Sequence, residues 1–528
     1  MGEFAGKTIT EGGNIMERKW YVVLALISIV FLMTAQQSSA KTLFYARPSI
    51  GNSIDPPTHR GDEATLSMVP VYEGLVTTEK GRPVPELALS WQSSPDFQEW
   101  TFKLRPGVKF HDGTPFNAEA VKFNFDRILQ TKKTSLGYYL KFGMADGVQV
   151  VDDLTIKVKL NKSFPLFPMD VTFSSYWMAS PTYVKKHMTS DDPYAEKWMA
   201  NHECGTGPYE LSEWLPEQKA TYKQFKGYWG APPKLDTIVM QVVKDPTTAR
   251  LMLERGDVDV ADRLTVEQFD ELAKKPGIKV VYFPIPRIVW CTWDTSKAPF
   301  DDENLRKAIS YAINYDEIIK FVEGGRVKRI RGLTPPGIPG YADLDVPTFN
   351  LEKAKEYMAK SKYAKGGLSV DLYYAAERRA QFDQVAEYIQ SYVKKIGVDI
   401  KPQKVAFPAQ LAKMKEGGYG ITLMTWSAGI PDPEDVVGWL LNSARDSGGW
   451  NASYWFDKRA VELITKAPTV VDPKEREKMY IELEKRAVDQ AVYLYLYQVQ
   501  EPIAMRDTVK NLHYDTFNYM NFPVIEKD

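Results

Sequence analysis

The chain has 528 residues, which is longer than a single hydrophobic core usually serves, so we expect two or more lobes. Hydrophobic residues make up 44% of the chain, which is enough to fill such cores. The 67 Lys and Arg residues nearly balance the 68 Asp and Glu residues, so no overall field favours nucleic acid or an anionic membrane. The composition therefore indicates a globular protein with no nucleic-acid partner.

Residues 16–40 have the pattern of a secretory signal peptide. Two basic residues precede an apolar run over 20–35, and small residues ending at Ala40 form a cleavage site. A membrane anchor is the alternative, but the run is shorter than the roughly 20 residues that span a bilayer. Residues 1–15 are polar and precede a second Met, so we interpret them as an upstream segment or a start artefact.

The cysteines bear on compartment and anchoring. No cysteine follows the apolar run on which a lipid anchor could form, so we expect an exported, soluble, periplasmic protein without a lipid anchor. The chain's two cysteines are Cys204 and Cys291. Export permits a disulfide between them, and two buried free thiols are the alternative. Two cysteines are too few for a zinc site built on thiolates.

A short stretch near residue 100 contains a strand, a turn and a helix start. Residues 101–104 alternate polar and apolar as a half-buried strand does, Asp112 and Gly113 are typical of a turn, and Asn117 can cap the following helix. His111 directly precedes the turn. Because no nucleophile motif or H-E-x-x-H motif accompanies it, we expect a scaffold residue whose replacement changes stability by about 1 kcal/mol.

Later segments alternate between strand and helix patterns. Period-two alternation predicts strands at 155–160 and 368–372. Over 382–396 the apolar residues recur on one helical face, Gly397 ends the helix, and Val398 starts a strand. A helix that leads so directly into a strand favours a layered lobe of the α/β or α+β class.

Two residue groups could suggest a ligand or metal site. The tyrosines at 493, 495 and 497 have period two and could form an aromatic wall, although a buried strand explains them better. The five histidines show no metal-ligand spacing, so we expect neither a bound metal nor a cofactor; they lie at 59, 111, 187, 202 and 513. A metal held inside a small chelator stays an alternative as ligand.

The segment TFKLRPGVKFHDGTPFNAEAVKF, at 101–123, closely resembles the signature of family 5 extracellular solute-binding proteins, the peptide and nickel receptors of ABC importers. Five more segments follow the family's pattern: PVYEGLV (70–76), GTGPYELSEWLPEQKATYKQFKGYWG (205–230), LMLERGDVDVAD (251–262), WDTSKAPFDDENLRKAISYAINYDEII (293–319) and VYLYLYQVQEPIAMRDTVKNL (492–512). The likeness covers essentially all of 41–528.

The resemblance implies an α/β fold of the bilobal periplasmic-binding-protein architecture, with two mixed-sheet lobes joined by hinge strands. Lobe 1 would comprise 41–295 plus 491–528, with an extra subdomain near 74–204, and lobe 2 would comprise 296–490. The function implied is that of a periplasmic receptor, not an enzyme. It would deliver a small ligand, which is a peptide or peptide-like and could be an anionic conjugate, to the permease subunits of an ABC importer by lobe closure. We expect a monomer.

One family segment, of the form W-x-x-D-x-x-D/E-P, lines the ligand cleft, and its first Asp holds the ammonium of a peptide ligand. Here Trp426 and Ser427 begin the segment, and Gly429 stands at the ammonium position. A buried ammonium without a carboxylate costs several kcal/mol, in general about 3–5. Another carboxylate would have to replace it, from Asp432, Glu434 or Asp62. Trp426 could equally be a core residue.

Four further residues are candidate ligand contacts. Arg378 and Arg379 lie near the position where some family members present an arginine to a ligand carboxylate, which a guanidinium can bind bidentately. A solvated turn with two charges is the alternative. His59 and Arg60 lie in a loop that resembles the first-lobe loop bordering the ligand. The turn-forming residues of that loop explain its shape but not these two side chains.

Two other functions fit parts of the sequence. A secreted hydrolase acting on glycan or peptide would need two carboxylates at catalytic separation, and acidic residues are plentiful. A periplasmic chaperone-like binder would take unfolded chains without a defined ligand. Among small ligands, a peptide, an opine-like conjugate, an oligosaccharide and a metal chelate all agree with the sequence.

The position of the cleavage site gives a direct prediction. We expect the exported protein to begin at Lys41, because Ala40 ends the small-residue pattern behind the apolar run. N-terminal sequencing of the exported protein checks this. Recovery of Met16 or Met1 as the first residue would contradict it.

Overall fold

The computed structural model describes residues 41–59, 61–79, 81–131, 144–379, 381–430, 432–441, 451–514 and 520–528. The predicted signal peptide and Arg60 lie outside the described residues. Across the described ranges, no helix combines the length and the apolar character that crossing a membrane requires.

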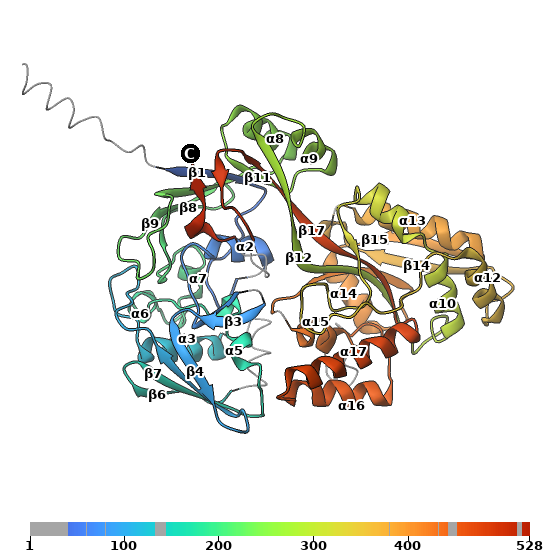
Figure 1. Ribbon diagram of the computed structural model, residues 1–528, viewed down its shortest axis with the longest axis horizontal. Coiled ribbons are helices and arrows are strands. Elements are labelled where there is room, and N and C mark those ends of the chain that lie inside the picture. Colours follow the sequence, from blue (N-terminus) through green and yellow to red (C-terminus); the bar gives the residue numbers. More distant parts are fainter. Residues whose placement is uncertain are drawn as a thin grey trace, which may run out of the picture. The chain divides into compact units, whose positions relative to one another are not determined.

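The central element is a mixed sheet with eleven strands among the described residues (Figure 1). In spatial order its main path is β15 (Val398–Lys404), β14 (Leu368–Tyr374), β16 (Ile421–Ser427), β12 (Ile278–Trp293), β17 (Tyr493–Arg506), β11 (Val260–Asp262), β1 (Thr42–Arg47), β10 (Thr237–Val242), β9 (Lys219–Gln224) and β8 (Tyr209–Leu215), while β13 (Lys328–Arg329) pairs with β17. The strands predicted at 368–372 and from Val398 are therefore confirmed.

The long strands β12 and β17 run side by side in the middle of this sheet, between β16 and β11 (Figure 1). The first half of β12 pairs with β17 alone, over 278–284, whereas its second half, over 287–293, also pairs with β16. Between the halves the register shifts, at Pro284 and Pro286. Proline has no N–H to donate to a ladder, so an interruption falls naturally here.

A second sheet of four strands is built from β4 (Ala88–Ser93), β5 (Glu99–Leu104), β7 (Thr155–Leu160) and β6 (Met144–Asp152). Helix α3 (Ala118–Gln130) contacts β6 and β7 of this sheet. It begins after the predicted cap Asn117, whose side chain accepts a hydrogen bond from the Ala120 N–H at 3.0 Å. The strand, turn and helix expected around residue 110 are thus confirmed.

Two short hairpins and the remaining helices complete the fold. The hairpins are β2 (Val76–Glu79) with β3 (Arg82–Pro85), and β18 (Val509–Lys510) with β19 (Glu526–Lys527). The other helices are α2 (Gly61–Met68), α5 (Phe167–Asp170), α6 (Pro181–Lys186), α7 (Glu196–Met199), α8 (Pro246–Arg255), α9 (Val266–Leu272), α10 (Glu303–Ala312), α11 (Tyr315–Glu317), α12 (Leu351–Lys360), α13 (Phe382–Val393), α14 (Phe407–Glu416), α15 (Pro433–Leu440), α16 (Lys458–Lys466) and α17 (Pro473–Asp489). Shorter helical turns are η1 (Ser174–Tyr176), η2 (Ile318–Val322), η3 (Ala376–Arg378), η4 (Lys394–Ile396), η5 (Ala467–Thr469) and η6 (Phe522–Val524).

The boundary between α13 and β15 follows the sequence closely. The predicted helix over 382–396 consists of α13 and the turn η4, and it ends at Gly397, which has a φ of 82°. The residues expected on its inner face, among them Val385 and Ile389, are fully buried. A left-handed residue after a helix is most easily a glycine, so this one position sets the end of the helix.

Successive side chains of β12 enter two different cores, as the period of a strand requires. Val289 and Cys291 pack in one hydrophobic cluster, and Ile288 and Trp290 pack in another. The tyrosines at 493, 495 and 497 on β17 are buried at 0–2% exposure, which confirms the buried strand. Both cysteines lie among the described residues, and both are buried free thiols.

His111 is more constrained than its sequence suggests. Its Nδ1 lies 2.8 Å from Glu203 Oε2, and its Nε2 lies 3.0 Å from the Gly207 carbonyl oxygen. Both partners are acceptors, which suits a protonated ring with two donors. Burial lowers the pKa of His111, but the charge and hydrogen bond of Glu203 raise it by more, so it lies above its usual value. His111 lies at the predicted turn, and its buried pair with Glu203 leads us to expect a larger effect on stability than the sequence does.

We expect His111→Ala to lower the free energy of unfolding by about 3–5 kcal/mol, because it leaves Glu203 buried without its cation. The folded-state pKa of His111 is raised, so its contribution is complete below the unfolded pKa of about 6.5 and is lost as pH rises through the folded pKa. Urea unfolding of both proteins at about pH 6 and about pH 8 checks this.

The difference between the two proteins should be larger at the lower pH. The exposed His513 offers a control, since His513→Ala should stay within about 0.5 kcal/mol. A pH-independent loss in His111→Ala would contradict the charged pair.

Candidate ligand-binding site

A cavity of about 260 Å³ lies beside the register shift of β12. Among the described residues, five arginines and two glutamates line it, so we call it the arginine cavity. They are Arg263, Arg287, Arg326, Arg378, Arg379, Glu323 and Glu501. Such a lining favours an anion, because guanidinium groups bind carboxylate and phosphate oxygens in a fixed fork geometry.

Arg379 is held in this cavity by one carboxylate. Its Nε lies 3.2 Å and its Nη2 lies 2.5 Å from the two oxygens of Glu323. Glu323 is 3% exposed and Arg379 is 15% exposed. Burial lowers the pKa of Arg379, but Glu323 raises it by more, so the guanidinium keeps its charge. Glu323 thereby fixes the orientation of Arg379 at the cavity wall.

The side chains of Arg378 and Arg379 differ in exposure and in the residues they contact. Arg378 ends the turn η3 and is exposed, and its guanidinium lies 4.5 Å from the centre of the Phe407 ring. Both side chains line the arginine cavity, so the structure brings these two predicted contacts together.

Arg287 is a cavity residue that the sequence interpretation missed. It stands opposite Ser427 in the ladder between β12 and β16. Burial lowers the pKa of Arg287; Glu501 raises it, while Arg379 and Arg378 lower it further, and the net shift is downward. The neighbouring arginines therefore create a positive potential that a ligand anion would relieve. A charged residue inside the apolar run 285–293 was the signal that could have identified it.

The sequence interpretation also missed Arg263, a cavity residue with an unusual backbone conformation. It follows β11 with a φ of 56°, which is unusual for a residue other than glycine. Its Nε lies 3.1 Å from Glu501 Oε1 on β17. Such backbone conformations persist where the surroundings enforce them, and they cluster at functional sites.

The other expected residues of β16 do not line this cavity. Trp426 stands opposite Ile288 in the ladder, is half-buried, and packs against a hydrophobic cluster. Ser427 is the next residue of β16 and stands opposite Arg287 in the same ladder. The strand then ends, and Gly429 lines a second and larger cavity.

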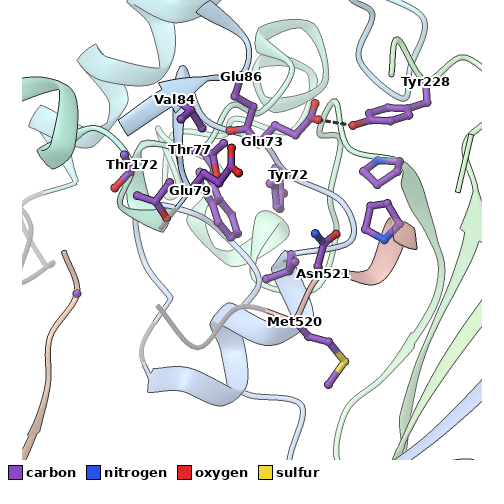
Figure 2. Close-up of a pocket in the computed structure, with 16 residues that line it drawn as sticks. Tyr72, Glu73, Thr77, Glu79, Val84, Glu86, Thr172, Tyr228, Met520 and Asn521 are labelled. Carbon is purple, nitrogen blue, oxygen red and sulfur yellow. Dashed lines mark hydrogen bonds between the residues drawn. The ribbon is translucent and has the colours of Figure 1, made fainter. Parts of the chain in front are cut away.

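This second cavity, of about 430 Å³, is lined by three glutamates among the described residues, so we call it the glutamate cavity. Figure 2 shows Glu73, Glu79 and Glu86 in its wall, with Glu73 directed toward Tyr228. Residues of β2, β3 and the segment 520–523 also line it, together with Val69, Tyr72, Thr172, Trp177, Pro208, Tyr228 and Gly429. Both cavity volumes lie near the range of small-molecule sites, about 300–1,000 Å³.

The carboxylate of Glu73 is already satisfied by its neighbours. It accepts hydrogen bonds from the hydroxyls of Thr206 and Tyr228 and from the indole N–H of Trp229, each at 2.8 Å. Burial raises the pKa of Glu73 to about 7, although these bonds lower it. Burial also raises the pKa of Glu86 well above its usual value. Both groups therefore carry less than full charge near neutral pH.

The carboxylates considered as replacements at the ammonium position have other partners. Asp432 accepts from Arg476 at 2.6 and 2.5 Å and also caps α15. Glu434 accepts from the Tyr480 hydroxyl at 2.6 Å. The side chain of Asp62 lies outside the described residues. Asp432 and Glu434 thus serve the fold around α15 and α17.

The neutral side chain of His59 links two segments of the chain by hydrogen bonds. Its Nδ1 lies 2.8 Å from the Pro56 carbonyl oxygen, and its Nε2 lies 3.0 Å from Ser174 Oγ. Burial lowers the pKa of His59 to about 4, although the Pro56 hydrogen bond raises it. The neutral ring joins the loop before α2 to the turn η1. The described chain holds no group of three His, Cys, Asp or Glu residues placed to bind a metal.

Comparison with known proteins identifies the class. Residues 82–448 match the family model described as bacterial extracellular solute-binding proteins, family 5 Middle. The chain belongs to this family, whose members are ligand carriers and not enzymes. The α/β, bilobal periplasmic-binding-protein fold expected from the sequence is confirmed.

Individual relatives cover most of the chain. The dipeptide-binding protein of Escherichia coli (strain K12) is 30% identical, with 94% of this chain and 96% of that protein covered. The probable D,D-dipeptide-binding periplasmic protein DdpA of the same organism is 29% identical, with 87% and 88% covered. The periplasmic binding protein DppA from Helicobacter pylori, solved with peptide STSA, has a TM-score of 0.77 and 25% identity over 92% of this chain and 98% of that one.

The structural role of Asp432 can be tested. We expect Asp432→Ala to lower the free energy of unfolding by about 3–5 kcal/mol, because Arg476 would stay buried without its carboxylate. Chemical denaturation measures this. Asp489→Ala, which removes an exposed pair with Lys485, is a matched control and should stay within about 0.5 kcal/mol. A small loss of stability with a large loss of ligand affinity would instead make Asp432 a ligand anchor.

Proposed function

We propose that this protein is a periplasmic receptor that delivers a small ligand to the permease subunits of an ABC importer by closure of two lobes. The ligand is peptide-like or an anionic conjugate, carries a carboxylate or phosphate, and does not use a free α-ammonium as its main anchor. The single observation that carries this proposal is the excess of arginines over carboxylates in the arginine cavity.

The sequence ranges from which the cavity residues come support the closure of two lobes around a ligand. Arg263 and Arg287 belong to the sequence range expected for lobe 1, and Glu323 and Arg379 belong to that expected for lobe 2. A ligand anion between them would contact both ranges at once. Such a ligand stabilises a closed state by contacts that an open state lacks, and this difference in affinity drives closure.

The chemistry of the relatives agrees with part of this proposal. Two of them are named as dipeptide or D,D-dipeptide binders, and a peptide-like ligand has a terminal carboxylate for which the arginine cavity is suited. Its amine end is different, because Gly429 supplies no carboxylate and Asp432 and Glu434 are engaged elsewhere. The site therefore selects for the anionic end of the ligand.

Calorimetry with free and N-acetylated di- and tripeptides tests the ligand class. We expect acetylation to leave affinity unchanged or to increase it. For the tightest of these peptides, Arg379→Ala should cost about 2–5 kcal/mol of binding, because a desolvated contact to the carboxylate is lost. Arg459→Ala, which removes an exposed arginine paired with Glu482, should leave binding unchanged. Strong binding of free peptides, abolished by acetylation, would refute the proposal.

A further inference from the structure

Phe173 and Gly429 meet beside the glutamate cavity, although they are far apart in the sequence. Phe173 precedes the turn η1, and Gly429 follows β16. A Cβ built on Gly429 would lie 3.1 Å from Phe173 Cδ2 and closer still to Cε2. Any side chain at position 429 therefore collides with the Phe173 ring.

The segment that carries Phe173 is firmly held. The Tyr176 hydroxyl donates to Asp170 Oδ2 at 2.7 Å, and the Thr172 hydroxyl donates to the Met169 carbonyl at 2.8 Å. The Ser174 hydroxyl bonds the neutral His59 ring, and Phe173 itself packs against the hydrophobic cluster that includes Phe167 and Tyr176. These contacts hold the backbone that carries the ring and pack one part of the ring.

The backbone opposite is also held. The Gly429 N–H donates to Asp435 Oδ2 at 2.5 Å, and the preceding Ala428 N–H donates to the Pro286 carbonyl at 2.9 Å. Because each side is fixed within its own segment, added volume at 429 must displace the ring or separate the two segments. Glycine therefore permits the close approach of position 429 and Phe173.

We propose that Phe173 determines specificity by occupying the space that a carboxylate at position 429 would need, so that the ligand end next to this contact must be uncharged. This inference rests on the proposed function and deepens it. The ring atoms that approach Gly429 are apolar carbons, which offer an ammonium group no hydrogen-bond acceptor. The nearby carboxylate of Glu73 already accepts three hydrogen bonds and does not replace the missing anchor.

Four proteins test this: the unchanged chain, Phe173→Ala, Gly429→Asp and the double variant. Calorimetry near neutral pH uses alanyl-alanine and N-acetyl-alanyl-alanine as probes. We expect the double variant to bind the free dipeptide at least about tenfold more tightly than the unchanged chain or either single variant, and acetylation to abolish that gain. Gly429→Asp/Phe173→Leu, which keeps most of the bulk, should show a smaller gain.

Two results would overturn the inference. One is that Gly429→Asp alone gains as much as the double variant, because Phe173 would then not stand in the way. The other is that the double variant folds and gains nothing. The unchanged chain tests the proposed function separately: its own preference for the free dipeptide over the acetylated one would refute that function, whatever the variants do.

A second pair of variants keeps the test decisive if the Asp variants fail to fold. Gly429→Ala should lower the melting temperature, and adding Phe173→Ala should remove the loss due to the alanine at 429. An equal loss in both backgrounds would show that the two residues do not touch, and it would overturn the inference.

Discussion

The pairing of β12 with β17 is the constraint on which the candidate site depends. These strands share one ladder, and the ladder is interrupted where Pro284 and Pro286 cannot donate. The buried Gln498 side chain donates to the Ile285 carbonyl oxygen at 3.0 Å. This hydrogen bond gives that carbonyl a partner where the ladder is interrupted. Arg287 is the residue of β12 that comes directly after Pro286, and Glu501 lies on β17. The arginine cavity therefore lies where the pairing of two buried strands is interrupted.

Buried charges in this protein serve two different purposes. Arg476 and Asp432 form a buried pair between α17 and the start of α15, and neither residue lines either cavity. Arg379 and Glu323 form a similar pair, but they do so in the wall of a cavity that contains more arginines than carboxylates. A buried pair alone is weak evidence for either stability or function. It is the surplus of one charge around an open volume that distinguishes a binding site from a structural pair.

The region around Gly429 is defined by a close contact between two distant segments. Trp426 lies near the end of β16, and Gly429 is approached by the ring of Phe173 from the opposite segment. The two features depend on each other sterically, since neither a side chain at 429 nor free movement of the ring is compatible with the other. Glycine here follows from the close approach of an aromatic ring and not from an unusual φ.

The sequence by itself determined the elements whose patterns are local. The helix that begins after Asn117, the helix end at Gly397 and the buried strand with three tyrosines were all predicted, because capping, φ preference and side-chain alternation act over a few residues. The family followed from ordered motifs along the chain. Arg378 and Arg379 became candidates because the family resemblance implies an arginine near their position.

Only the tertiary structure decided which residues meet. His111 and Glu203 are 92 positions apart, and neither residue's local pattern reveals that they form a buried pair. Arg287, Glu323 and Glu501 converge from three separate segments, and Phe173 reaches Gly429 from a segment far away in the sequence. Such contacts depend on strand order and on the register shift in β12, which long-range packing fixes and local preference does not.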